Sequence, residues 1–200
     1  MSLVVPMSSE ISQKIVRRLE EGNQVISTIF SSKEMVSIIE DCSERCISSL
    51  NSGGKIFFMG NGGSAADSQH LATELVSRYL KERAAIPAIA LTTDTSAITA
   101  IGNDYSFEKI FSRQLQALAT ANDVVIGIST SGNSPNVILG VETARSLGCF
   151  TIGFTGCDGG KLSKSVDLAI VVPSSQVPCI QQAHIAIGHI ICEIIEEAIQ

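Results

Sequence analysis

The spacing of hydrophobic and polar positions changes once along the chain, near residue 53. Before that point, apolar residues recur every three or four positions in two stretches, which predicts a pair of helices over residues 9–52. A capping box is expected to open the second helix, with Ser31 as N-cap and Glu34 as the third helical residue. Beyond residue 53, short apolar runs predict buried strands at 55–60, 86–92, 123–129, 149–156 and 167–173.

Helical patterns separate most of these runs, at 64–80, 106–119 and 135–147. Buried strands that alternate with helices predict a five-stranded parallel sheet in a three-layer α/β/α sandwich. The gap between the last two runs leaves room for one or two helical turns. A last helix over about 178–199 is apolar over so wide an arc that burial against another subunit is plausible. We expect a single domain, with a helical hairpin in 1–53 and an α/β core with the C-terminal helix in 54–200.

Composition narrows the classes of function. Aromatic residues make up 4% of the chain and the net charge is -6, which disfavours both base stacking and binding to a phosphate backbone. No apolar stretch reaches the length of a membrane span, and the N-terminus lacks the features of a signal peptide. The six cysteines form no CxxC pair and are expected to be reduced core thiols. The sequence therefore predicts a soluble cytoplasmic protein without a nucleic-acid or membrane partner.

Ligands of open parallel sheets bind beyond the carboxyl ends of the strands. This rule selects four expected loops, at residues 60–67, 92–104, 129–136 and 155–161. The first formally satisfies the GxGxxA pattern of dinucleotide folds. The acidic residue that should close the second strand is missing, however, and Asp94 lies well past that position. No Walker A pattern occurs, so neither nucleotide motif is supported.

The third loop concentrates hydroxyl groups at the start of a predicted helix. Ser134 followed by Pro135 has the chemistry of an N-cap and first helical residue. Free backbone N–H groups and hydroxyls at the positive end of a helix can bind a phosphate monoester without a lysine. Ser64 is expected to open the helix of the first loop in the same way. Ordinary capping with solvent-facing serines remains the alternative.

The chain has only three histidines, and all lie on predicted helices. His70 and Glu74 are four residues apart, so their side chains can meet on one helical face. Imidazole and carboxylate suit acid–base chemistry near neutral pH as well as a divalent metal. On the last helix, Gln181 and His189 are separated by about 12 Å of an ideal helix. Either that helix starts or bends near Gln181, or the two residues serve sites at a subunit interface, which we favour.

Five motifs in order over residues 50–200 carry a resemblance to a known family. They are GNGGSAADSQHLATEL, AIGNDYSFEKIFSRQL, DVVIGISTSGNSPNV, TGCDGGK and IQQAHIAIGHIICEII. Together they resemble the phosphoheptose isomerases, which belong to the sugar-isomerase (SIS) domain family with its flavodoxin-like fold. The resemblance implies an aldose–ketose isomerase that acts on a sugar phosphate, as a homotetramer with active sites at subunit interfaces.

The same resemblance assigns roles to individual residues. Glu74 and His189 are implied as the acid–base pair, and His184 is expected to have a packing role. Gln182 stands where many relatives have glutamate, a change that reduces local charge without removing a catalytic group. One Zn²⁺ per subunit is implied on His70, Glu74, Gln181 and His189. Substrate contacts are implied for Asn61, Gly62, Gly63, Ser64, Glu74, Asn103, Asp104, Ser129, Thr130, Ser131, Ser134 and Gln181.

The implied reaction converts sedoheptulose 7-phosphate to D-glycero-D-manno-heptose 7-phosphate through an enediol. It is the first step towards ADP- or GDP-heptose precursors of cell-surface polysaccharide such as lipopolysaccharide. Two alternatives stay open: a non-catalytic SIS protein that binds the replication initiator as a scaffold, and another sugar-phosphate isomerase. The resemblance of the scaffold proteins fails at the acid–base positions. Because Glu74 and His189 are both present, the sequence favours the enzyme.

Overall fold

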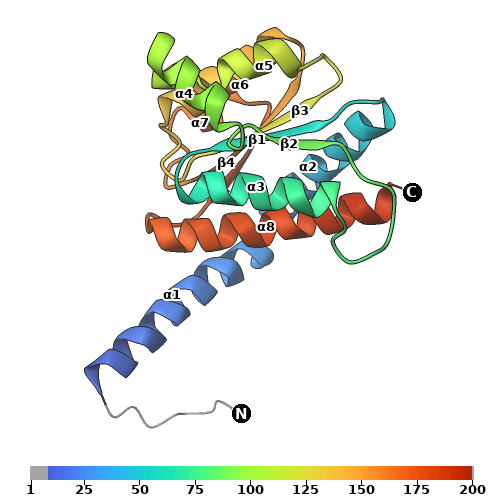
Figure 1. Ribbon diagram of the computed structural model, residues 1–200. Coiled ribbons are helices and arrows are strands. Elements are labelled where there is room, and N and C mark those ends of the chain that lie inside the picture. Colours follow the sequence, from blue (N-terminus) through green and yellow to red (C-terminus); the bar gives the residue numbers. More distant parts are fainter. Residues whose placement is uncertain (1–8, 200) are drawn as a thin grey trace.

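A five-stranded parallel sheet forms the centre of the molecule (Figure 1). The computed structural model describes residues 9–199. The strands are β1 (Ile56–Gly60), β2 (Ala88–Ala90), β3 (Val124–Ile128), β4 (Phe150–Gly156) and β5 (Leu168–Val172). Their order in the sheet is β2-β1-β3-β4-β5, so the strand order reverses between β1 and β3. The crevice at the carboxyl ends of these two strands is where ligands of such sheets bind.

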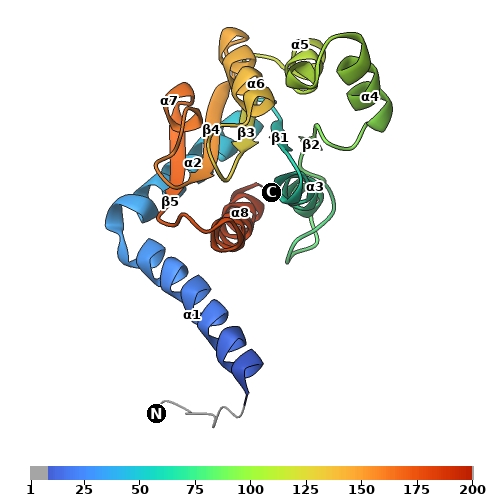
Figure 2. The same ribbon diagram turned by 90° about the vertical axis from the view of Figure 1, so that its left-hand side faces the viewer.

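Helices cover both faces of the sheet (Figures 1 and 2). Successive side chains of a strand point to opposite faces of the sheet, so Ile56 and Phe58 face one core and Phe57 and Met59 face the other. The first core lies under α2 (Lys33–Asn51), α3 (Gly63–Val76) and α8 (Val177–Ala198). The second lies under η1 (Phe107–Lys109), α5 (Ser112–Leu118), α6 (Pro135–Ser146) and α7 (Leu162–Ser165). The predicted three-layer sandwich is therefore confirmed.

The first helix, α1 (Glu10–Ser31), projects from the body of the molecule (Figures 1 and 2). Only Gly22 and Ile29 are buried along it. Gly22 permits a close crossing with α8, because a Cβ there would lie 2.5 Å from Oε1 of Gln182. Most of its apolar face is left without a partner in its own chain, at Ile11, Ile15, Val16, Leu19 and Phe30.

Two local predictions are wrong in instructive ways. The expected loop 92–104 is mostly a helix, α4 (Thr95–Asp104), which Asp94 caps by accepting a hydrogen bond from the N–H of Ala97 at 2.9 Å. None of its residues is fully buried, and only Ile98 and Ile101 pack partly on the second core, so its apolar signal is weak. The expected helix 106–119 is split into η1 and α5.

The start of α2 also differs from the expected capping box. Ser31 is the last residue of α1, and Ser32 is the N-cap of α2, where its hydroxyl accepts from the N–H of Met35 at 3.2 Å. Adjacent serines offer the same chemistry, and the one-residue break between the helices selects the second. Glu34 therefore lies at the second helical position rather than the third.

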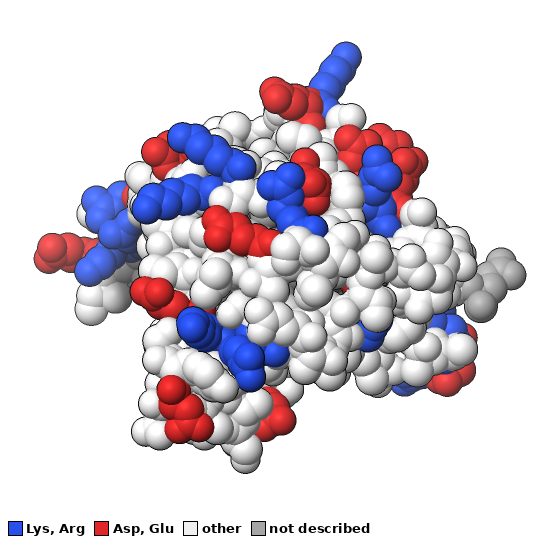
Figure 3. All heavy atoms as spheres, turned by 90° about the horizontal axis from the view of Figure 1, so that it is seen from above, with Lys and Arg blue, Asp and Glu red and all other residues white. Residues whose placement is uncertain are grey.

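The cysteines are largely what their apolar surroundings predict. Five of the six are buried free thiols, and Cys157 is exposed with a φ of 55°. Among residues 9–199, no helix combines the length and apolarity that a membrane crossing requires. On the face seen from above, basic side chains are interspersed with acidic ones (Figure 3).

Candidate active site

Two loops meet at the point where the strand order reverses. The glycine loop (residues 60–65) follows β1, and the serine loop (residues 129–134) follows β3. The side-chain amides of Asn61 and Asn136 join them by two reciprocal hydrogen bonds of 2.8 Å. Asn136 is buried at the start of α6 and also accepts from the N–H of Val137. This amide pair ties the glycine loop to the helix that follows the serine loop.

The serine loop turns tightly and leaves its hydroxyls at the N-terminus of α6. Ser134 is the N-cap and Pro135 follows it, as predicted, but the Ser134 side chain makes no capping hydrogen bond. Its hydroxyl lies 2.9 Å from the hydroxyl of Ser129 instead. The turn needs Gly132, whose φ is +64° and which packs directly on the backbone of Gly159. In the first turn of α6, Pro135 has no N–H, Val137 donates to Asn136 and Ile138 donates to the carbonyl of Ser134, so the N–H of Asn136 is the one left for an anion.

The glycine loop differs from its prediction at Ser64. α3 begins at Gly63, and Gly62 is the N-cap with a φ of 56°. Ser64 is buried, with 4% of its surface exposed, so it does not present its hydroxyl as a cap. A helix N-terminus still follows each loop at the point where the strand order reverses. At the N-terminus of α3, however, the backbone rather than a serine side chain is accessible.

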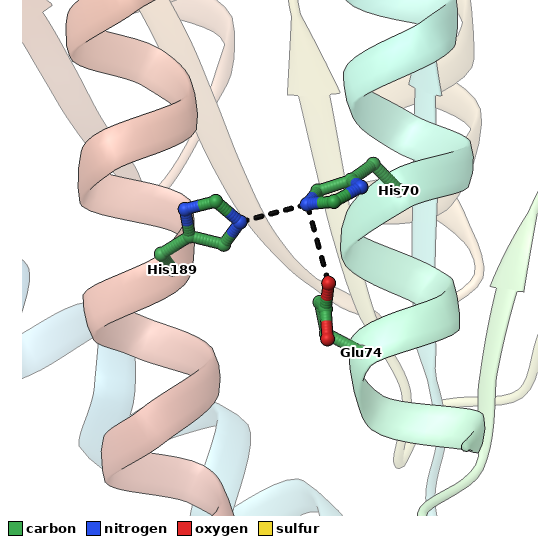
Figure 4. A group of neighbouring side chains, drawn as sticks. All are labelled: His70, Glu74 and His189. Carbon is green, nitrogen blue, oxygen red and sulfur yellow. Dashed lines mark hydrogen bonds and ion pairs between the residues drawn. The ribbon is translucent and has the colours of Figure 1, made fainter. Parts of the chain in front are cut away.

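His70, Glu74 and His189 form a compact histidine–glutamate cluster between α3 and α8 (Figure 4). Nε2 of His70 lies 2.7 Å from Nε2 of His189 and 3.2 Å from Oε1 of Glu74. The side chain of Glu74 is 18% exposed and that of His70 is 47% exposed, so the cluster is open to solvent on one side. The sequence predicted the His70–Glu74 pair, and the fold adds His189 to it.

The cluster has the chemistry of a cation site. One ligand atom from each residue lies within 4.8 Å of the other two. Three groups that can act as electron-pair donors converge here, and only a shared proton or a cation satisfies such an arrangement. Two imidazoles and a carboxylate with one open side match the three-ligand sets of catalytic zinc. The residues present therefore fit the predicted metal.

Gln181 does not join this cluster within the chain. α8 runs without a break from Val177 to Ala198, which leaves about 12 Å of helix between Gln181 and His189. The Gln181 amide instead packs directly on Gly63, at the first turn of α3. Of the two explanations weighed for the spacing, a helix that starts at Gln181 is not what the structure shows, and a site at a subunit interface stays a prediction. Within one chain, Gln181 therefore lies beside the glycine loop.

His184 behaves as a packing residue. Its side chain is fully buried, and Nε2 lies 3.0 Å from the carbonyl oxygen of Thr155. Burial lowers the pKa of His184 to about 4, with the hydrogen bond to Thr155 opposing the shift. The imidazole is therefore neutral at physiological pH and has no role in the cluster.

Asn103 and Asp104 are not brought to the loops by this chain. Both are exposed at the end of α4, and the Asn103 amide donates to the Asp104 carboxylate at 2.8 Å. α4 packs mainly on η1 and stands apart from α3 and α8 (Figure 2). If these residues contact substrate, they do so in an assembled oligomer.

Two residues near the cluster were missed by the sequence reasoning. Asp67 lies one turn before His70 on α3, and burial raises the pKa of its carboxyl, with His70 opposing the shift. The spacing of three residues between them was the signal that could have revealed it. Tyr79 stacks on His189 with ring centroids 5.6 Å apart, and no local pattern connects residues so distant in sequence.

Comparison with known families identifies the family of the chain. A family model described as the SIS domain matches residues 19–156. The chain belongs to the SIS domain family.

Individual relatives narrow the family further. The phosphoheptose isomerase of Trichlorobacter lovleyi is 54% identical over 83% of this chain and 85% of its own length. That of Aliarcobacter butzleri is 50% identical over 95% of this chain and 97% of its own length. The solved structure of the phosphoheptose isomerase from Neisseria gonorrhoeae has a TM-score of 0.88 at 39% identity and covers 94% of this chain and 99% of its own. Within the SIS domain family, the chain groups with the phosphoheptose isomerases.

Proposed function

We propose that the protein is an isomerase that converts sedoheptulose 7-phosphate to D-glycero-D-manno-heptose 7-phosphate. Relatives that are 50% and 54% identical to it over the aligned residues are phosphoheptose isomerases. The observation that carries the proposal is the histidine–glutamate cluster, because it places a carboxylate and an imidazole beside the helix that opens at the glycine loop. A scaffold protein does not need this pair.

The two loops are proposed to hold the phosphate. Ser129, Thr130, Ser131 and Ser134 supply hydroxyls, and the first turn of α6 supplies the backbone N–H of Asn136. His70 lies seven residues after Gly63, or about 10 Å along α3. That separation matches an extended seven-carbon sugar phosphate, whose C1 and C2 lie at the end opposite its phosphate. Binding energy from the phosphate then holds the reacting carbons in register.

Glu74 is proposed as the base that removes the C1 proton and forms the enediol. The carboxylate is held by His70 at 3.2 Å yet keeps part of its surface free. His189 is placed to serve the substrate oxygens, because its Nε2 faces the same space. The proton returned to C2 completes the conversion of ketose to aldose.

His70, Glu74 and His189 would hold the zinc ion, with Gln181 left to contact substrate from its place beside Gly63. When bound, zinc supplies a Lewis acid that polarises the substrate carbonyl. A carboxylate cannot be a tightly held ligand and a free base at the same instant. Either Glu74 would hold the ion loosely, or the role of base would lie partly elsewhere.

A homotetramer with sites at subunit interfaces is proposed for the assembly. An apolar groove of about 730 Å³ lies between α1, α2 and α8, lined by residues such as Ile29, Ile39 and Ile187. The unpartnered apolar face of α1 adds to this surface, and both are typical of subunit contacts. Such an assembly can also bring Asn103 and Asp104 to the active site of a neighbouring subunit.

The free thiols of Cys42, Cys46, Cys149, Cys179 and Cys192 are consistent with a cytoplasmic setting. There the product would enter the synthesis of ADP- or GDP-heptose for cell-surface polysaccharide.

An assay with sedoheptulose 7-phosphate, followed by aldose formation, tests the proposal. We expect turnover that falls on treatment with a chelator and returns when zinc is restored. Absence of aldose from the zinc-loaded protein would contradict the function. Turnover that resists removal of all metal would contradict the zinc but leave the isomerase intact.

A further inference from the structure

The connection between α3 and β2 is held by a buried ion pair outside the cluster. The side chains of Arg83 and Glu196 are 7% and 1% exposed, and Nε of Arg83 lies 3.2 Å from Oε1 of Glu196. The Glu196 carboxylate accepts backbone N–H groups from Tyr79 at 2.9 Å, Leu80 at 2.7 Å and Lys81 at 3.0 Å. A segment without regular structure is thus fixed at three consecutive residues to one carboxylate on α8.

Arg83 fixes the other side of the same segment, at the end of α3. One terminal nitrogen donates to the carbonyls of Leu75 at 2.8 Å, Ser77 at 2.9 Å and Ala84 at 3.0 Å. The other donates to the carbonyl of Glu74 at 2.8 Å. The last carbonyls of a helix have no intrahelical partner, and here a guanidinium satisfies them. The backbone of Glu74 is therefore held directly by Arg83.

The segment carries one ring to the cluster. Tyr79 lies nearly parallel to the imidazole of His189, with an interplanar angle of 14° and centroids 5.6 Å apart. On another side, His70 meets His189 edge-on at 4.9 Å. Glu196 is seven residues after His189, two turns along the same face of α8. The carboxylate that fixes the Tyr79 backbone and the imidazole that receives its ring thus belong to one rigid helix.

Stability alone gives little reason for this arrangement. A buried ion pair loses hydration, and apolar residues of similar volume are often at least as stabilising. Burial raises the pKa of the Glu196 carboxyl, but the N–H groups of Leu80, Tyr79 and Lys81 and the charge of Arg83 outweigh it and lower the pKa overall. The carboxylate stays ionised, and its specific effect is to fix the position of the Tyr79 backbone.

We propose that Tyr79, Arg83 and Glu196 are positioning residues that orient His189 and Glu74 for the proton transfer. The pair fixes the segment, the Tyr79 ring restricts rotation of the His189 imidazole, and Arg83 holds the turn that carries Glu74. The inference rests on the proposed function only for the role of the two residues that it orients.

Four full-length variants test the inference, each measured for kcat, KM and the imidazole proton signals of His189. Tyr79→Phe keeps the ring, Tyr79→Leu removes it, and Glu196→Gln weakens the anchor without changing its shape. Glu197→Gln is the matched control, because Glu197 is the exposed neighbour that pairs with Lys81 at 3.0 Å. With only three histidines in the chain, His189→Gln assigns the signals.

For Tyr79→Leu and Glu196→Gln we expect kcat to fall by about 10- to 100-fold, which is the size of effect expected when a reacting group is displaced by about 1 Å or less. KM should stay within about threefold, because the serine loop is untouched. The His189 signals should shift in both variants as the Tyr79 ring leaves or moves, and Tyr79→Phe and Glu197→Gln should resemble the parent.

The inference would be overturned if Tyr79→Leu left both kcat and the His189 signals unchanged. It would also be overturned if Glu196→Gln lowered the thermal stability but left kcat and the His189 signals unchanged. The imidazole signals do not depend on turnover. If the parent protein fails to isomerise sedoheptulose 7-phosphate, the proposed function fails, whereas the restraint on His189 is still decided by these signals.

Discussion

The serine loop and the histidine–glutamate cluster are assembled from the chain in opposite ways. The serine loop places its hydroxyls and helix N-terminus within a few consecutive residues, and its distances follow from one tight turn at Gly132. The cluster joins His70 to His189 across 119 positions of sequence and depends on how α3 packs beside α8. Local structure therefore goes far towards the proposed anion site, whereas the proposed acid–base site depends on the tertiary fold.

The contrast predicts different kinetic consequences, and the largest belongs to the cluster. Replacing Glu74 with Gln keeps the shape of the side chain but removes the base. We expect kcat to fall by about 10²- to 10⁴-fold, the usual contribution of a general base. KM should change little, because the phosphate is held elsewhere. Steady-state kinetics on sedoheptulose 7-phosphate measure both.

Glu193→Gln is the control for that change, since it alters an exposed carboxylate of α8 four residues after His189. A Glu74→Gln protein that keeps its full kcat would remove Glu74 from the role of base.

A smaller effect is expected in the serine loop. Ser134→Ala removes one hydroxyl at the proposed phosphate site. A hydrogen bond to a charged group contributes about 1.5–3 kcal/mol, so kcat/KM should fall by about 10- to 100-fold, mostly through KM. Thermal stability should fall less than on loss of a helix cap, because the Ser134 side chain makes no capping hydrogen bond and gives up only its 2.9 Å contact with the Ser129 hydroxyl.

Ser32→Ala sharpens this comparison, because Ser32 does cap its helix. That variant should lose about 1 kcal/mol of stability and keep its KM. If Ser134→Ala lowers the melting temperature as much as Ser32→Ala and leaves KM unchanged, the serine loop is an ordinary cap rather than a phosphate site.

The smallest effect concerns His184, which shares α8 with His189 but is buried. Its pKa is about 4 in the folded protein, below the value of an unfolded histidine. The unfolded chain therefore binds more protons between these values, and stability is lost as pH falls from about 6.5 towards 4. His184→Gln should lose less melting temperature than the parent between pH 7 and pH 5. An equal loss in both proteins would mean that His184 does not contribute to acid sensitivity.

The sequence predicted the features that depend on local spacing and missed those that depend on packing between distant segments. Alternating buried runs predicted all five strands and the sheet, because each depends on local apolar spacing. α4 was missed because it buries no residue fully and only Ile98 and Ile101 form its short apolar stripe. Ser31 was chosen over Ser32 because a one-residue boundary between two helices leaves no distinct signal.

At the site, His70 and Glu74 were predictable from helical spacing alone. His189 joined them through a family resemblance rather than through any pattern in its own helix. Gln181 was placed with them by the same resemblance; within the chain it lies beside Gly63, about two turns of α8 from His189, and its place in the metal site stays a prediction. Tyr79 and Glu196 act through contacts between distant segments, which spacing cannot reveal.

The central claim is that a carboxylate moves a proton between C1 and C2 of a bound sugar phosphate. Isomerisation of sedoheptulose 7-phosphate in deuterated water tests it most directly, because the partly exposed Glu74 exchanges its proton with solvent during the enediol step. We expect deuterium at C2 of the aldose product, detected by NMR or mass spectrometry. A product that carries only hydrogen at C2 would mean direct hydride transfer from C1 and would contradict the account.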